Sequence, residues 1–96
     1  MAQAITLKVL TQEGLVFEDE AVSVIAPGEP GYLGILRSHA PLVTTLKPGR
    51  LTWRRVSGEW RTVSVGQGLL EIVHDQLTVL TDTVSAPAEQ PAPQLA

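Results

Sequence analysis

The sequence predicts an all-β fold, either a sandwich or a barrel of short strands. Turn-forming residues recur roughly every eight to twelve residues, and the segments between them are rich in Val, Ile and Leu without a helical period. With 96 residues, the chain is long enough for one domain with its own hydrophobic core. It contains no cysteine, which excludes disulfides, thiolate catalysis and cysteine-ligated zinc.

The N-terminal part is predicted to form three strand segments. Apolar and polar residues alternate over residues 5–9, which is the two-residue period of a half-buried strand. A turn is expected at residues 12–14, and residues 15–17 and 21–26 are again rich in apolar and β-branched side chains. The acidic run at residues 18–20 predicts a bend or a solvated strand edge.

The rest of the folded part alternates short apolar segments with turns. A hairpin turn is expected at residues 57–59, and His74-Asp75 lies in a later turn, where Asp is favoured for the bond of its side chain to nearby backbone. Gly66 and Gly68 indicate a bulge or a close approach of another backbone. The predicted strands are residues 33–36, 42–46, 51–56, 60–65, 69–73 and 77–81.

The composition changes after Thr83, where prolines and alanines dominate. Each of the prolines at 87, 91 and 93 removes a backbone donor, and together they forbid a stable helix. The sequence therefore predicts a folded domain over residues 1–84 and a disordered or extended Pro/Ala-rich tail over residues 85–96.

The segment 31–49 contains three glycines, two prolines and one of the two histidines of the chain. Its glycines permit backbone angles that side chains forbid, and Ala40-Pro41 favours an extended path, so we predict a shaped turn that feeds a strand. His39 is then expected on a rim, beside Arg37 and Ser38. Such a histidine fits a catalytic group, an anion site or a docking surface.

Catalysis and metal binding find little support in the sequence. Neither His39 nor His74 lies in a motif with a nucleophile and an orienting acid, so His39 is either a turn histidine bonded to a local carbonyl or a partner contact. The acidic residues 18–20 alternate between strand faces, so they are expected to keep an edge soluble rather than to bind a metal. No glycine cluster leads from a strand into a helix, so no cofactor or nucleotide site is predicted.

The charge pattern also excludes classes of partner. The formal net charge is −3, and Arg54 and Arg55 would point to opposite faces of a strand, so no basic stripe for nucleic acid is expected. The chain has no run of about 18 apolar residues, so no membrane-spanning helix is predicted.

Several ordered motifs resemble the epsilon subunit of F-type ATP synthases, which is called delta in mitochondria. GILRSHAPLVTTLKPG is similar to the family's GILPGHAPLLTALKPG, and GQGLLEIVHDQLTVLTDT is similar to its SGGFLEVxxNxVTVLADT. The opening segment ITLKVLTQEGLVFEDEAVSVIAPGEPGYLGIL also looks like the first strands of that family. Together these motifs cover residues 5–83, and a match of several ordered motifs is far more specific than one short pattern.

The resemblance implies a flattened β-sandwich of about ten short strands. It also implies a non-catalytic rotor subunit that packs against the gamma subunit and on the polar loops of the c-ring, at the cytoplasmic face of the plasma membrane. In the family the G-x-x-G turn and the His-Ala-Pro segment lie at the end that faces the ring. The residues that this assigns to ring contact are Gly31, Tyr32, Leu33, Arg37, Ser38 and His39, and Thr11 is expected near gamma or the ring.

The chain departs from the family in ways that change these expectations. Tyr32 stands where the family often has Glu, and Arg37-Ser38 replaces Pro-Gly, so the electrostatics of docking should differ. The Pro-rich tail follows where the family commonly has a helical pair, so an inhibitory or ATP-binding role is not expected. The alternatives are a stand-alone β-sandwich interaction module and, more remotely, an enzyme with His39 as general base.

Overall fold

The computed structural model describes residues 4–85, and these residues form nine β-strands and no helix. The strands are β1 (Ile5–Thr11), β2 (Gly14–Gly28), β3 (Gly31–Leu36), β4 (Leu42–Leu46), β5 (Gly49–Arg55), β6 (Trp60–Val65), β7 (Gly68–Val73), β8 (Gln76–Thr81) and β9 (Val84–Ser85). The predicted all-β class is confirmed, and each strand predicted between residues 33 and 81 overlaps one of these elements.

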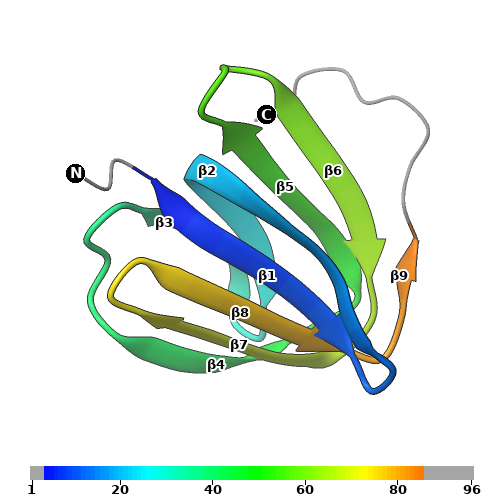
Figure 1. The fold of residues 1–96 in the computed structure, drawn as a ribbon. Helices are drawn as coiled ribbons and strands as arrows, with labels where there is room; N and C mark the ends of the chain where they lie inside the picture. The colour runs from blue at the N-terminus through cyan, green and yellow to red at the C-terminus, as the bar shows by residue number, and fades with distance from the viewer. Residues whose placement is uncertain (1–3, 86–96) are drawn as a thin grey trace.

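The strands form one hydrogen-bonded sheet that folds into the two layers of a sandwich (Figure 1). One layer contains β1, β8, β7 and β4 in this order, and the other contains β3, the later part of β2, β5, β6 and β9. β2 takes part in both layers, because it pairs with β1 up to Ala21, with β5 from Ala21 onward and with β3 from Ser23 onward. A register shift between Ala21 and Ser23 marks the change of partner, as expected where a bulge bends a strand.

Alternate apolar side chains from both layers meet in a single core. Trp53 of β5 is buried there and stacks on Phe17 of β2, with ring centroids 5.1 Å apart. Full burial of one such apolar side chain contributes about 1.5–3 kcal/mol, so the core is the main source of stability. The largest fully buried side chains are Ile5, Leu7, Val9, Val24, Ile35, Leu46, Leu51, Leu70, Ile72, Leu77 and Val79.

β2 runs without interruption through the acidic run 18–20, where a bend or a solvated edge was predicted. Glu18 and Glu20 are exposed, as the solvated-edge alternative requires, but Asp19 is half-buried. The bend alternative is wrong at this position, because β1 pairs with β2 along the whole acidic run. The irregularity of β2 lies just after the run instead, at residues 21–23.

The two glycines at the start of β7, one just before the strand and one as its first residue, permit the close approach that the sequence predicted. A side-chain carbon on Gly68 would overlap the carbonyl oxygen of Leu80, and one on Gly66 would overlap the carboxylate of Asp82. β9 extends to Ser85, one residue past the expected domain boundary. The remaining residues of the predicted tail, 86–96, lie outside the described residues.

Candidate functional site

The candidate contact residues fall into two groups at opposite ends of β3. The first group lies at the start of β3, where Gly31 is found. A row of cross-strand pairs runs from there through β2, β4, β7 and β8 to the end of β1. Thr11 is the last residue of β1, so it lies at the same end of the molecule as Gly31. The loop that contains Arg37, Ser38 and His39 follows the other end of β3, where it lies beside the β7–β8 turn (Figure 1). A six-residue strand separates the groups by about 17–20 Å. The resemblance implied that both groups face the ring, and in the structure the extended strand β3 connects them.

The loop between β3 and β4, residues 37–39, is closed by backbone hydrogen bonds. The amide of His39 donates to the carbonyl of Leu36 over 3.2 Å. The ring nitrogen Nδ1 of His39 lies 2.7 Å from the carbonyl oxygen of Ala40, and because a carbonyl only accepts, Nδ1 is the donor. The ring of His39 is therefore bonded to a local carbonyl, as expected for a turn histidine, which was one of the two roles, beside a partner contact, that its sequence context allowed.

Asp75, in the β7–β8 turn, holds this loop from outside. The amide of Ser38 donates to Oδ1 of Asp75 over 2.6 Å, and the amide of Thr6 donates to the main-chain oxygen of Asp75 over 2.9 Å. The sequence placed Asp75 in a turn, which is correct, but it predicted a bond to nearby backbone. That part is wrong, because the carboxylate accepts from a residue 37 positions earlier in the chain.

The other group lies around the β2–β3 and β4–β5 turns. Tyr32 is 60% exposed, but its hydroxyl accepts a hydrogen bond from the amide of Arg50 over 3.0 Å. Gly49 leaves room for this contact, since a side-chain carbon there would overlap the Tyr32 hydroxyl and Pro27. Gly31 has a φ of 143°, which favours glycine. The phenol of Tyr32 is thus held over the β4–β5 turn with one exposed side.

Two of the candidate residues have structural contacts of their own. Leu33 is half-buried and packs against the core, so most of its side chain supports the sandwich. The hydroxyl of Thr11 accepts a hydrogen bond from the amide of Glu13 over 3.2 Å and so helps to close the β1–β2 turn. Both residues lie at the end of the molecule that contains Gly31.

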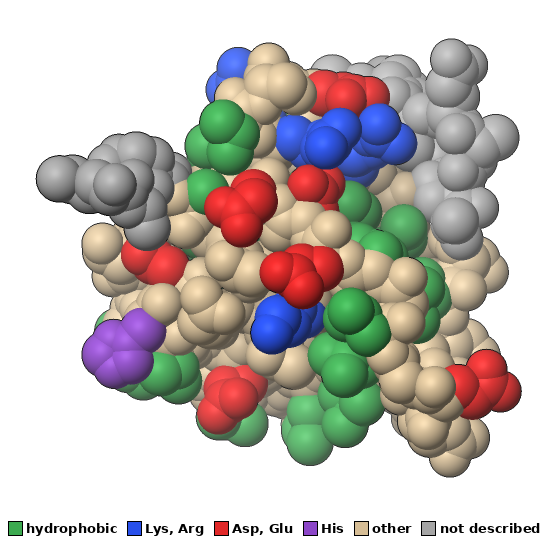
Figure 2. All heavy atoms as spheres, viewed as in Figure 1, with side chains coloured by type: hydrophobic (Ala, Val, Ile, Leu, Met, Phe, Trp, Pro, Cys, Tyr) green, Lys and Arg blue, Asp and Glu red, His purple; other side chains and the backbone are tan. Residues whose placement is uncertain are grey.

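A row of leucines crosses the outer face of β1, β2, β7 and β8. Leu10 pairs with Leu15 on one side and with Leu80 on the other, and Leu80 pairs with Leu69. Leu15, Leu69 and Leu80 are each about half exposed, at 55%, 51% and 46%. We call these four residues the apolar row. Figure 2 shows hydrophobic side chains gathered over this part of the face.

A shallow hollow of about 450 Å³ adjoins the apolar row and is lined by Leu69, Leu80, Gln12 and the β8–β9 junction. Sequence reasoning did not single out this surface. The sequence signals for this surface were the adjacent apolar residues at 69–70 and at 79–80. Neighbouring residues in a strand face opposite sides, so one residue of each pair must face outward. Exposed apolar residues in a contiguous patch indicate a surface that binds another protein.

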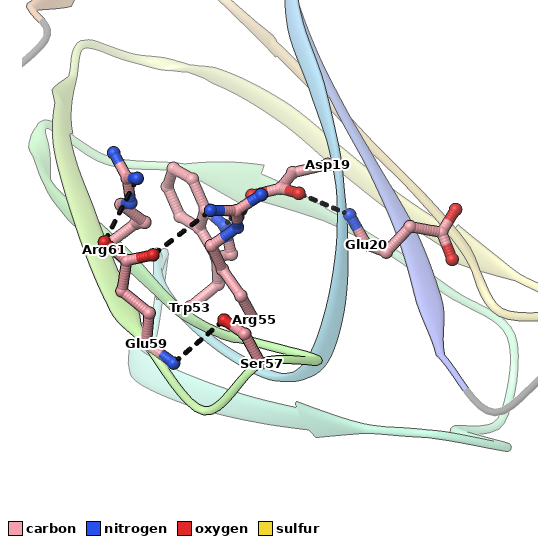
Figure 3. A network of polar contacts seen from close by, with 7 residues as sticks. All are labelled: Asp19, Glu20, Trp53, Arg55, Ser57, Glu59 and Arg61. Atoms are coloured by element: carbon pink, nitrogen blue, oxygen red, sulfur yellow. Dashed lines mark hydrogen bonds and ion pairs between the residues drawn. The ribbon is translucent and has the colours of Figure 1, made fainter.

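A second polar cluster joins the β5–β6 hairpin to β2 (Figure 3). Oδ2 of Asp19 accepts a hydrogen bond from Nε1 of Trp53 over 2.9 Å and lies 2.9 Å from Nε of Arg55. The contact with Arg55 is an ion pair without the alignment of a hydrogen bond. Glu59 extends the chain of charges, because its carboxylate lies 3.1 Å from both Arg55 and Arg61. Asp19 therefore does more than keep an edge soluble, as the sequence suggested for it.

Within residues 4–85, no group of three or more His, Cys, Asp or Glu side chains gathers as a metal site would require. The same residues include no helix that is long and apolar enough to cross a membrane. The surfaces that stand out in this part of the chain are the apolar row and the two loops at the ends of β3.

Comparison with known proteins identifies related sequences over nearly the whole chain. Two similar curated proteins are the ATP synthase epsilon chain of Moorella thermoacetica, 44% identical over 86 residues, and that of Acidithiobacillus ferridurans, 46% identical over 84 residues. The matches cover 90% and 86% of this chain, but 64% and 58% of the relatives. The chain thus spans about three fifths of the length of these relatives.

Solved structures show the same fold at low sequence identity. A chain in the Euglena gracilis mitochondrial ATP synthase, described as OSCP/F1/c-ring, matches with a TM-score of 0.82 at 17% identity, over 90% of this chain and 55% of that chain. A chain of the Tetrahymena thermophila mitochondrial ATP synthase central stalk and c-ring matches with a TM-score of 0.68 at 14% identity, over 84% and 65% of the two chains.

The family model described as "ATP synthase, Delta/Epsilon chain, beta-sandwich domain" matches residues 4–87. This range contains every strand that the structure describes. The predicted family is therefore confirmed, and the chain belongs to the ATP synthase delta/epsilon family through its β-sandwich domain.

Proposed function

We propose that this chain is a non-catalytic central-stalk subunit of an F-type ATP synthase. It docks on the gamma subunit and on the c-ring, so that the two turn together and couple ion transport to ATP synthesis or hydrolysis. The family match over residues 4–87 is the observation that supports this proposal. In the assembled complex the chain lies at the cytoplasmic face of the plasma membrane and contributes contacts rather than acid, base or nucleophile.

The apolar row is the surface that we assign to gamma. Its exposed leucines leave apolar area in water, and burial of such area contributes about 25 cal/mol per Å². The centres of stable protein interfaces are depleted in charge and enriched in apolar side chains, as this row is. Thr11, next to Leu10 at the end of β1, lies at the border of this contact.

The c-ring contact runs along β3, because this strand connects the two groups of candidate residues. β3 pairs with β2 alone, so its other edge is unpaired within the described residues. Tyr32 and Leu36 share one face of this strand, and both are more than half exposed. We call this exposed face of β3, together with the 37–39 loop that follows it, the strip. The cation of Arg37 in this loop favours ring loops that carry an acidic group.

Co-purification with gamma tests the proposal. The tagged chain is mixed with isolated gamma subunit and, separately, with a detergent-solubilised c-ring, and the retained amounts are compared. Leu80→Lys should reduce retention of gamma at least about tenfold, because a charge would replace the centre of the apolar contact. Val56→Lys is the control, since Val56 is also an exposed apolar residue, at 62% against 46% for Leu80, but lies in the β5–β6 turn.

The same experiment separates the alternatives. Failure of the unchanged chain to retain gamma would favour a stand-alone β-sandwich interaction module. Equal loss with Leu80→Lys and Val56→Lys would reject the apolar row as the contact surface while leaving the subunit assignment intact.

A further inference from the structure

We propose that Asp75 is the positioning residue of the 37–39 loop. Through the hydrogen bond from the Ser38 amide to its carboxylate, it sets the orientation in which Arg37 and His39 meet the partner. This inference rests on the proposed docking function and adds to it a residue that lies on a different hairpin, outside all the candidate contact residues.

The loop needs a stabilising contact from another segment because its backbone contains a strained residue. Ser38 has a φ of 66°, in the left-handed region that favours glycine, and serine pays a conformational penalty there. Without a compensating contact, Ser38 would relax toward ordinary backbone angles. Because Arg37 and His39 flank it directly, both side chains would then change direction.

The bond to Asp75 is well suited to oppose this relaxation. Its length of 2.6 Å is short for an amide donor, and hydrogen bonds from amides to carboxylates are stronger than those between neutral groups. The donor is the amide of the strained residue itself, so the bond acts directly on the φ that must be held.

Asp75 is itself fixed by three neighbouring segments. It lies with His74 in a two-residue turn in which both φ values are positive, 60° and 49°, as hairpin turns of this length require. The first pair of the β7–β8 ladder, Val73 with Gln76, flanks the turn. The amide of Thr6 also donates to the carbonyl of Asp75, which links the turn to the start of β1. The loop is therefore anchored, through Asp75, to the strands of the sandwich.

Two substitutions distinguish the role of the Asp75 carboxylate from the role of the turn conformation. Asp75→Gly removes the acceptor, and glycine accepts the positive φ without strain, so the turn is kept. Asp75→Asn keeps an acceptor oxygen and a residue type that tolerates this conformation. Glu71→Gln is the control for charge, because it removes the same charge from an exposed position on β7.

The first measurement is hydrogen exchange of the Ser38 amide by NMR in the 96-residue chain. Asp75→Gly should accelerate this exchange at least about tenfold, because a hydrogen bond to a charged group is lost. Asp75→Asn and Glu71→Gln should leave it close to that of the unchanged chain. An unaltered Ser38 amide in Asp75→Gly would overturn the inference at once.

The second measurement is affinity for the assembled gamma and c-ring complex. We expect Asp75→Gly and Arg37→Glu each to weaken binding severalfold, and Asp75→Asn to bind like the unchanged chain. Loss of affinity in Asp75→Asn despite a protected Ser38 amide would mean that the carboxylate touches the partner, which overturns a positioning role. Loss in Arg37→Glu but not in Asp75→Gly would also overturn the inference, and the docking proposal would stand. Unchanged affinity in both variants would reject docking through this loop altogether.

Discussion

At Gly68 the absence of a side chain is what allows β7 to lie against β8. The missing side-chain carbon would overlap the backbone carbonyl of Leu80, and a backbone atom cannot rotate away as a flexible side chain could. Gly34 is the opposite case, because a side-chain carbon there would meet no atom within 4 Å. The same residue type is thus obligatory at one position and replaceable at another.

Gly68→Ala should lower the free energy of unfolding by about 2 kcal/mol or more, since the β7–β8 ladder must move to accept the methyl group. Gly34→Ala should change it by less than about 0.5 kcal/mol. Chemical denaturation followed by Trp fluorescence measures both. Equal stability of the two variants would show that the ladder yields without cost.

Residues of the 37–39 loop should affect function more strongly than folding. Arg37→Glu and His39→Ala are expected to reduce coupled ion pumping in reconstituted enzyme, because they alter the strip assigned to the c-ring. His39→Ala also removes the bond to Ala40, which is worth about 1 kcal/mol, so the isolated chain should remain folded. Arg61→Glu is the control for charge, because it makes the same charge change as Arg37→Glu but lies on β6, away from the loop. Unchanged pumping in the combined Arg37→Glu and His39→Ala variant would remove this loop from the ring contact.

The β5–β6 hairpin is joined to β2 by polar contacts as well as by the sheet. Asp19 accepts the hydrogen bond of the Trp53 ring nitrogen and forms an ion pair with Arg55, so its removal leaves a partly buried donor without its acceptor and takes away one of the two carboxylates that face Arg55. The outer part of the network, from Arg55 through Glu59 to Arg61, is more exposed and contributes little.

Asp19→Ala should therefore destabilise the chain by about 1–3 kcal/mol. Asp19→Asn should cost less, because its amide oxygen still accepts from Trp53. Glu18→Ala, one residue earlier on the exposed face, is expected to change stability by less than about 0.5 kcal/mol. Thermal or urea unfolding measures the series, and a loss in Glu18→Ala as large as that in Asp19→Ala would contradict the assignment.

The positions of the strands were predictable because they depend on local patterns. The two-residue alternation and the turn residues predicted β1 and the strands from β3 to β8, and Gly66 and Gly68 indicated a close approach that the structure contains. The acidic run was harder, because only pairing with β1 shows that β2 continues through it.

The contacts that shape the candidate site could not be predicted in the same way. Asp75 meets Ser38 over 37 positions and Asp19 meets Trp53 over 34 positions, and such partners become neighbours only when the sandwich closes. The apolar row needed the register of four strands to show that leucines of separate segments adjoin. The division of the contact residues between two ends of β3 likewise follows from the strand and not from their closeness in sequence.

The whole molecule presents two kinds of surface, and they should respond differently to salt. Raising the ionic strength from about 0.1 to about 1 M shortens the Debye length from about 10 to about 3 Å. Binding of gamma through the apolar row should change less than about threefold, whereas the c-ring contact near Arg37 should weaken more strongly. Affinity measurements with gamma alone and with the ring alone provide the comparison. A tenfold loss for gamma alone would indicate a charged interface instead.

The continuous course of β2 has a mechanical consequence. Because this one strand crosses from one layer to the other, a force applied to β1 reaches β3 and β5 along covalent bonds and sheet hydrogen bonds. It need not pass through sliding contacts between the faces of two independent sheets. A sandwich connected in this way resists shear between its layers, as the proposed position between gamma and the c-ring would require.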